Sequence, residues 1–225
     1  RYAMRLNCKL TGNTAPVPFN HLGVLTSTFH KWYGPDNDLH DATSLYGFGW
    51  LHGATVRSGA LHFPQGATWT LSFHDEADAH RVTQGILADP TVGFGMRVFD
   101  VQHQVTPAYS GCVRFEVASP VVTRTRRADG SQQYLLHDDP EATDSLTRTL
   151  RWKLKQAGFE SEHLESTVQF DRTYPNAHEK LSTIKGIDYK GSICPVVVTG
   201  TPEAVQFAWN VGVGELTGCG FGALK

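Results

Sequence analysis

The order of the periodic segments along the chain is the feature that most restricts its fold. Hydrophobic alternation predicts strands in the first half, and helical spacing predicts helices. In chain order, the expected elements are strand 1–10, helix 20–33, strands 45–51, 60–63 and 68–73, helix 75–87 and one or two strands in 92–105. Asn20 is the expected N-cap of the first helix. Such an order of elements is typical of the split βαβ unit.

The second half repeats this pattern with insertions. Its expected elements are strands at 113–117 and 122–126, a hairpin turn at Asp129-Gly130, a helix at 140–158, strands at 167–173, 181–189 and 193–199, and a helix from Thr201-Pro202-Glu203 to 209. The sequence therefore predicts an α+β protein of two tandem ferredoxin-like (RRM-like) modules, residues 1–107 and 111–225.

Charge and cysteine usage exclude several classes of protein. The 20 Lys and Arg against 22 Asp and Glu give a formal net charge of −2, which excludes a surface that is basic throughout but leaves a local basic face open. No apolar run approaches the ~20 residues of a membrane helix, so no membrane contact is expected. The four cysteines lie far apart without a CxxC pair, which excludes a zinc ribbon and a disulfide scaffold and favours a reduced, cytoplasmic setting.

The C-terminal segment 212–222 contains five glycines in eleven residues. Such a loop approaches a partner closely, and its successive N–H groups form a concave nest for phosphate. It lacks the lysine of a Walker loop, and Thr217 stands where a dinucleotide fingerprint needs a third glycine. Two interpretations stay open, a phosphate-binding loop and a glycine-rich hairpin that closes a sheet.

The form of this segment, Gly-x-Gly, a short polar stretch and then Gly-x-Gly-Phe-Gly, resembles the signature of the repeat-associated RNA-binding (RAMP) superfamily of CRISPR systems. Within it, the chain resembles the endoribonuclease that cuts CRISPR precursor RNA inside its repeats. Residues 17–21, the helix and then Leu39-His40-Asp41 are similar to that family's N-terminal region. The resemblance covers most of the chain. It implies a metal-independent cut, without a cofactor, in which the ribose 2′-hydroxyl attacks the phosphate and leaves a 2′,3′-cyclic phosphate.

Two histidines are the candidate acid and base of that reaction. His40 matches the family's catalytic histidine, and His30 lies near the helix end, where relatives often carry a tyrosine. Histidine suits both roles because its unperturbed pKa, about 6.5, lies near neutral pH. Relatives commonly place a lysine shortly after the catalytic histidine, and none follows His40 before Trp50. Lys31 and Tyr46 are the nearest substitutes as stabilisers of the transition state.

The candidate RNA contacts form three groups: the tail residues Gly212, Gly214, Gly218, Gly220, Phe221 and Gly222, the hairpin residues Arg124, Arg126 and Arg127, and the helix residues Arg148, Arg151 and Lys155. Arginine and lysine pair with phosphates, although a short charged run is also typical of a solvated face. The expected partner is CRISPR repeat RNA, as a hairpin or a single strand.

Two other functions stay open. One is a non-catalytic RNA-binding subunit that works with other subunits of a CRISPR effector complex. The other is a histidine-rich metal hydrolase, although the spacing of His30 and His40 shows no ligand pattern and no metal is expected. The chain is expected as a monomer or a homodimer.

Overall fold

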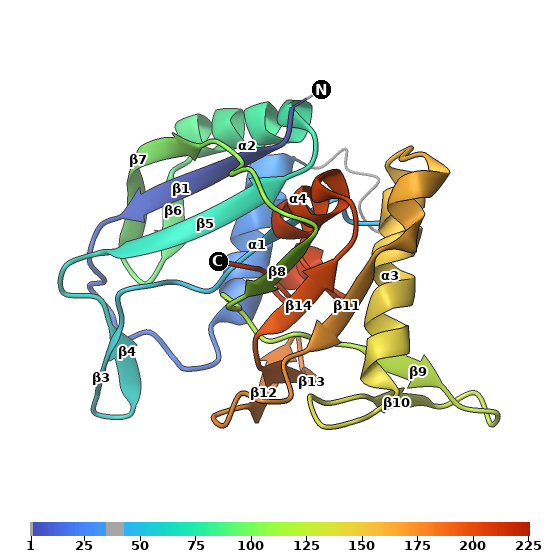
Figure 1. Ribbon diagram of the computed structural model, residues 1–225. Coiled ribbons are helices and arrows are strands. Elements are labelled where there is room, and N and C mark those ends of the chain that lie inside the picture. The colour runs from blue at the N-terminus through green and yellow to red at the C-terminus, as the bar shows by residue number, and fades with distance from the viewer. Residues whose placement is uncertain (1, 35–42) are drawn as a thin grey trace.

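The computed structural model describes residues 2–34 and 43–225, so His40 lies outside the described residues. The first part of the chain forms one antiparallel sheet with two helices (Figure 1). Its elements are β1 (Met4–Leu10), α1 (Leu22–Tyr33), β2 (Tyr46–Phe48), β5 (Ala67–Phe73), α2 (Glu76–Ala88), β6 (Thr91–Gly93) and β7 (Met96–Gln104). The strand order β2-β5-β1-β7-β6 is that of a ferredoxin-like unit, with β6 added at the edge.

Hydrophobic alternation along the strands places the first core on the helix side of this sheet. On β1, Leu6 and Cys8 are fully buried, and on β5, Trp69 and Leu71 are fully buried. Successive side chains of a strand point to opposite faces, so these residues all face one way. Phe29 of α1 packs into the same core. The sheet therefore holds α1 in a fixed place, which matters because α1 carries His30.

The second part of the chain builds a similar unit with a shorter sheet. Its elements are β8 (Cys112–Phe115), α3 (Ala142–Gln156), the 3₁₀ helix η2 (Ser161–Glu165), β11 (Thr167–Phe170), β14 (Val196–Thr199) and α4 (Pro202–Val211). The sheet order is β11-β14-β8. The last residues of the chain take the place of a fourth strand, since Ala118 N donates to Ala223 O (2.7 Å) and Lys225 N to Glu116 O (3.0 Å).

Three hairpins stand apart from the two sheets: β3 (Thr55–Arg57) with β4 (Ala60–His62), β9 (Arg124–Arg126) with β10 (Gln132–Tyr134), and β12 (His178–Ile184) with β13 (Ile187–Ile193). The single strand expected at 181–189 is wrong, because the chain reverses there at Lys185 and Gly186. Both residues have positive φ, 50° and 78°, as a two-residue type I′ turn requires. Apolar residues recur on both sides of the turn, at Leu181, Ile184, Ile187 and Tyr189, so they do not reveal it.

Of the helix N-caps predicted at Asn20 and Thr201, one is confirmed and one is wrong. Thr201 caps α4, accepting a hydrogen bond from Ala204 N (3.2 Å), as predicted. The cap expected at Asn20 is wrong: the N-cap of α1 is His21, and the Asn20 amide oxygen accepts from Thr183 N on β12 (3.2 Å). A tertiary hydrogen bond thus replaces the local one.

The predicted fold class, α+β with two tandem ferredoxin-like units, is confirmed. The boundary between residues 107 and 111 stays a prediction. In the part of the chain that the structure describes, no helix is both long and apolar enough to cross a membrane.

Candidate functional site

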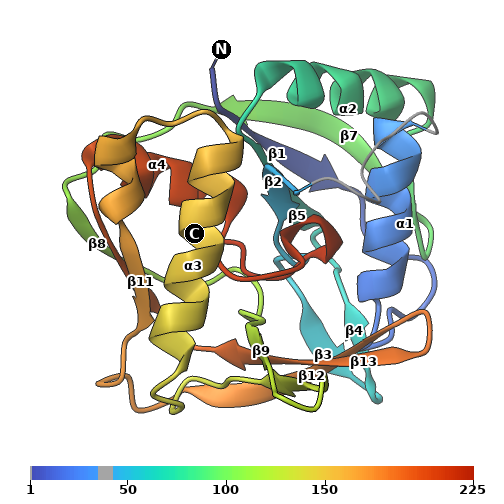
Figure 2. The ribbon, with the colours of Figure 1, turned by 90° about the vertical axis from the view of Figure 1, so that its right-hand side faces the viewer.

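The glycine-rich tail, residues 212–222, lies between the two ferredoxin-like units. In Figure 2 this red segment lies between α3 and α1. It contains a short 3₁₀ helix, η3 (Thr217–Cys219), which packs on β2 and α1. Thr26 of α1 donates through its hydroxyl to Cys219 O (3.3 Å). The tail is therefore one of the elements that join the helix carrying His30 to the second part of the chain.

Most backbone N–H groups of the tail are used inside the protein. Donors with an internal carbonyl acceptor are those of Gly212, Val213, Glu215, Cys219, Gly220, Phe221 and Gly222. Most of these residues are also buried. An N–H group that already has an acceptor is not open to a phosphate, so the tail in this conformation supports the packing interpretation. RNA binding by the tail stays a prediction.

Close packing explains why two positions of the tail are occupied by glycine. Gly220 has φ of +90°, and a Cβ there would lie 2.5 Å from Leu22 Cδ1. Gly222 has φ of +67°, and a Cβ there would overlap the carbonyl oxygen of Val213. A positive φ and missing space both favour glycine.

Lys153 of α3 is buried beneath the tail. Its ammonium donates to Thr217 Oγ1 (2.9 Å), and the Thr217 hydroxyl donates to Tyr46 O on β2 (3.0 Å). Burial lowers the pKa of Lys153 to about 7. The prediction from sequence includes Arg148, Arg151 and Lys155 of this helix but not Lys153. The sequence feature that indicates Lys153 is its position beside Leu150 and Leu154 on the apolar face of the helix, where a cation is unusual.

His30 lies in the last turn of α1, half-buried, with its ring 6.2 Å from that of Phe29 in an edge-on contact. The C-terminal end of a helix favours a protonated imidazole by about 0.3–1 kcal/mol. His40 follows in the segment 35–42, outside the described residues, so the predicted pair is not tested. Across residues 2–34 and 43–225, no three His, Cys, Asp or Glu side chains gather closely enough to hold a metal ion.

The two expected substitutes for the missing lysine have other contacts. Lys31 donates to Asp89 Oδ2 (3.1 Å) and to Thr91 O (2.8 Å). Hydrogen bonds from Thr91 and then from Lys31 hold the pKa of Asp89 at about 2. Tyr46 lies in the first core with its ring stacked 5.0 Å from Phe29, and burial raises its pKa to about 12. Their roles as stabilisers of the transition state stay predictions.

An open groove of about 530 Å³ runs along the exposed side of α1. The turn of the β12–β13 hairpin forms its other wall, with Lys185 on that side and Ser27 and Lys31 on the helix. Ser27 is one turn before His30, so the groove follows α1 toward the candidate site. Lys185 adds positive charge to this groove, whereas the charge of Lys31 is paired with Asp89.

The hairpin arginines differ in their partners. Arg124 forms a two-pronged ion pair with Glu215 of the tail (3.0 and 3.2 Å), which ties the hairpin to the tail. Arg127 lies 3.6 Å from Glu141 and also contacts Gln133. Arg126 is exposed. The three arginines therefore do not form one uncompensated patch, and Arg126 is the one without an ion pair among the described residues.

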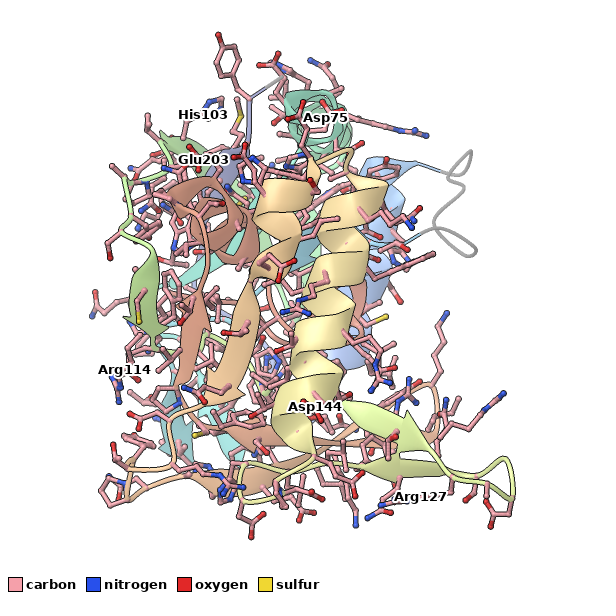
Figure 3. All side chains as sticks on the ribbon, turned by 45° about the vertical axis from the view of Figure 1, so that its right-hand side comes forward. Asp75, His103, Arg114, Arg127, Asp144 and Glu203 are labelled. Atoms are coloured by element: carbon pink, nitrogen blue, oxygen red, sulfur yellow. The ribbon has the colours of Figure 1, made fainter. Side chains whose placement is uncertain are left out.

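On α3, the predicted basic stripe divides in two. Arg151 donates to Ser166 O (2.9 Å) and Glu165 O (3.4 Å), so it anchors η2 to the helix. Arg148 and Lys155 are exposed on the outer face, which Figure 3 shows from the front. The outer face therefore offers two cations rather than three.

Comparisons with known proteins agree with this architecture. Residues 103–225 match the family model described as CRISPR associated protein Cas6, C-terminal. A search of curated proteins finds no match. A solved structure of a Cas6-related protein from Pyrococcus furiosus is 19% identical and superposes with a TM-score of 0.86 over 99% of this chain and 98% of that chain.

Two further structures are similar. A RAMP protein that binds different RNA substrates is 18% identical, with a TM-score of 0.83 over 99% of this chain and 98% of that one. A Cas6 product complex is 16% identical, with a TM-score of 0.70 over 100% and 99% of the two chains. At these identities the superpositions show the fold, whereas the family model covers more than half of the sequence. The chain belongs to the CRISPR-associated Cas6 family, whose members process CRISPR repeat RNA.

Proposed function

We propose that this protein is a metal-independent endoribonuclease that cleaves CRISPR precursor RNA within its repeats. The ribose 2′-hydroxyl loses its proton and attacks the adjacent phosphorus, and the bond to the 5′-oxygen of the next nucleotide breaks. The products are a 2′,3′-cyclic phosphate and a free 5′-hydroxyl. Such a reaction needs a base for the 2′-proton, an acid for the leaving oxygen and groups that stabilise the charge of the phosphorane.

His40 and His30 supply the base and the acid in this proposal. The observation that carries it is the packing of α1 against the tail through Thr26 and Cys219. His30 is one turn beyond Thr26, so its imidazole lies at the end of α1 that borders the segment containing His40. The related structures with RNA substrates or cleavage products support an RNA polyanion as the substrate.

The groove along α1 is the proposed path of the RNA backbone toward His30. Lys185 on one wall is a candidate phosphate contact, whereas Lys31 on the opposite wall is paired with Asp89 (3.1 Å). Arg126, Arg148 and Lys155 are further candidate phosphate contacts because their side chains are exposed. Phosphate contacts position the RNA, while unpaired nucleotides near the cut carry the sequence information.

The test is cleavage of cognate repeat RNA by the purified protein in EDTA. We expect products that end in a 2′,3′-cyclic phosphate. His40→Ala is expected to lower the single-turnover rate about 100-fold or more, the usual contribution of an acid or base, with little change in RNA affinity. His30→Ala is expected to slow cleavage as well. His178→Ala, a change of an exposed histidine on the β12–β13 hairpin, serves as the matched control with a wild-type rate.

The outcomes separate the alternatives. Tight RNA binding without products would assign the chain to the non-catalytic, RNA-binding class. Cleavage that EDTA abolishes would assign it to the metal hydrolases. A wild-type rate in His40→Ala would remove that residue from the mechanism, and an unchanged rate in His30→Ala would leave a mechanism with one histidine.

A further inference from the structure

Trp152 is the exception among the tryptophans of this protein. Trp32, Trp69 and Trp209 are buried and Trp50 is half-buried, whereas 53% of Trp152 is exposed to solvent. Its position on α3 is opposite the apolar face that carries Leu146, Leu150 and Leu154 into the second core. A large aromatic ring on the outer face adds nothing to that core. Exposed aromatic side chains of this kind are enriched at binding surfaces.

Two cations lie beside this ring on the same face of the helix. Arg148 precedes Trp152 by four residues and Lys155 follows it by three, so the three side chains form one stripe. The two cations are roughly 10 Å apart along the helix axis, from a rise of 1.5 Å per residue. Among the described residues, neither forms an ion pair with a carboxylate. The stripe thus presents an aromatic face between two uncompensated positive charges.

The ring is also fixed in orientation. Trp152 Nε1 donates to Thr43 Oγ1 (3.1 Å), which lies in the chain just before β2. This contact joins the outer face of α3 to the first ferredoxin-like unit, beside the tail that Lys153 holds from below. A ring that is held in place loses less conformational entropy when it binds a ligand.

We propose that Trp152 stacks against an unpaired base of the RNA substrate, with Arg148 and Lys155 contacting the phosphates on either side of that nucleotide. The proposal rests on the proposed function for the identity of the ligand. An aromatic face suits any base, and flanking cations suit the backbone, which is the usual composition of a surface that binds single-stranded nucleic acid. A neutral apolar partner would leave both cations without a role.

The test separates the ring from its hydrogen bond. Trp152→Phe keeps an aromatic ring and removes the N–H group, Trp152→Leu removes the ring, and Thr43→Val removes only the acceptor. Affinities are measured with repeat RNA that carries a 2′-deoxy nucleotide at the cut, so that cleavage does not interfere. We expect Trp152→Leu to bind about 5- to 100-fold more weakly, the usual loss for one stacked base. Trp152→Phe and Thr43→Val are expected to stay within about threefold of the wild type, because both keep an aromatic ring.

A second readout identifies the nucleotide. 2-Aminopurine is placed in turn at each unpaired position of the repeat, and its fluorescence is expected to be quenched at one position by the wild type and Trp152→Phe but not by Trp152→Leu. Phe99→Leu, which removes another exposed ring on β7, is the control and should leave affinity unchanged. Equal losses in all three variants at positions 152 and 43, or no loss in Trp152→Leu, would overturn the stacking proposal. Absence of RNA binding by the wild type would instead overturn the proposed function.

Discussion

Two positive side chains, Arg5 and Lys153, are buried where the two ferredoxin-like units meet. Arg5 Nη2 donates to Trp209 O (2.8 Å), in the last turn of α4, where unpaired carbonyl groups carry partial negative charge. Its guanidinium carbon also lies 3.4 Å from the centre of the Trp209 ring. Burial lowers the pKa of Arg5 to about 9. Neither cation has a carboxylate partner within the described part of the chain, so each favours the folded state less than an apolar residue of the same shape.

Lys153 makes the free energy of unfolding depend on pH above neutrality. Its pKa is about 7 in the folded protein against a usual value of 10.5, so between these pH values the unfolded chain binds the proton more tightly. The free-energy penalty of burying the charged ammonium has its full size below pH 7 and decreases as the pH rises toward 10.5. Nearby, burial raises the pKa of Tyr46 and Cys219, and Glu215 is paired with Arg124.

Lys153→Met is therefore expected to raise the free energy of unfolding at pH 6 by about 2–5 kcal/mol, with the gain shrinking toward pH 10. Urea unfolding of the wild type and the variant at pH 6, 8 and 9.5 measures the difference between their free energies of unfolding. Arg5 is present in both proteins, so its contribution cancels in this difference. A variant that is less stable than the wild type at every pH would contradict this account.

At the scale of elements, α3 carries cations in two different environments along one helix. Arg148 and Lys155 face solvent, and Arg151 holds η2 through two backbone carbonyls. A double change of Arg148 and Lys155 to alanine is expected to weaken RNA binding and to reduce the slope of log affinity against log salt by about 0.7–0.9 for each lost phosphate contact.

Arg151→Ala, on the same helix, is the matched control. It is expected to lower the melting temperature without changing that slope. Filter binding between 50 and 300 mM salt distinguishes the two variants. Equal slopes for the double variant and the wild type would mean that these side chains contact no phosphate.

The elements that sequence analysis placed best are those with local signals. Thr201 caps α4 through its own hydroxyl, and Asp129-Gly130 turns the β9–β10 hairpin with Gly130 at a φ of +84°. The prediction missed the turn at Lys185-Gly186, where Gly186 is a typical turn residue but a lysine with positive φ is rare. The N-cap at Asn20 failed because β12 competes for its side chain.

At the scale of the whole molecule, the tail packs into the junction between the two ferredoxin-like units. Gly220 packs against Leu22 of α1 and Phe48 of β2, far from it in sequence. Gly220→Ala must therefore move both of these core side chains, in addition to the strain of its positive φ.

Gly130→Ala is the matched control, because Gly130 has a similar φ of +84° with open space around it. We expect Gly220→Ala to cost about 1–3 kcal/mol more stability than Gly130→Ala, the usual penalty for overpacking a core. Thermal unfolding of both variants measures this difference. Equal losses of stability in the two variants would mean that the side chains at the junction rearrange without a free-energy penalty.

The sequence by itself determined the order of elements, the caps and turns with local signals, and the family signature at both ends of the chain. Periodicity shows which residues share a face of a helix or strand, but it does not show what that face packs against. Only the tertiary structure decided that Lys153 is buried under Thr217 while Trp152, its neighbour, is exposed. It likewise decided that the tail uses its N–H groups within the protein and that Tyr46 lies in the core. These features depend on contacts between segments far apart in the chain, which local patterns do not encode.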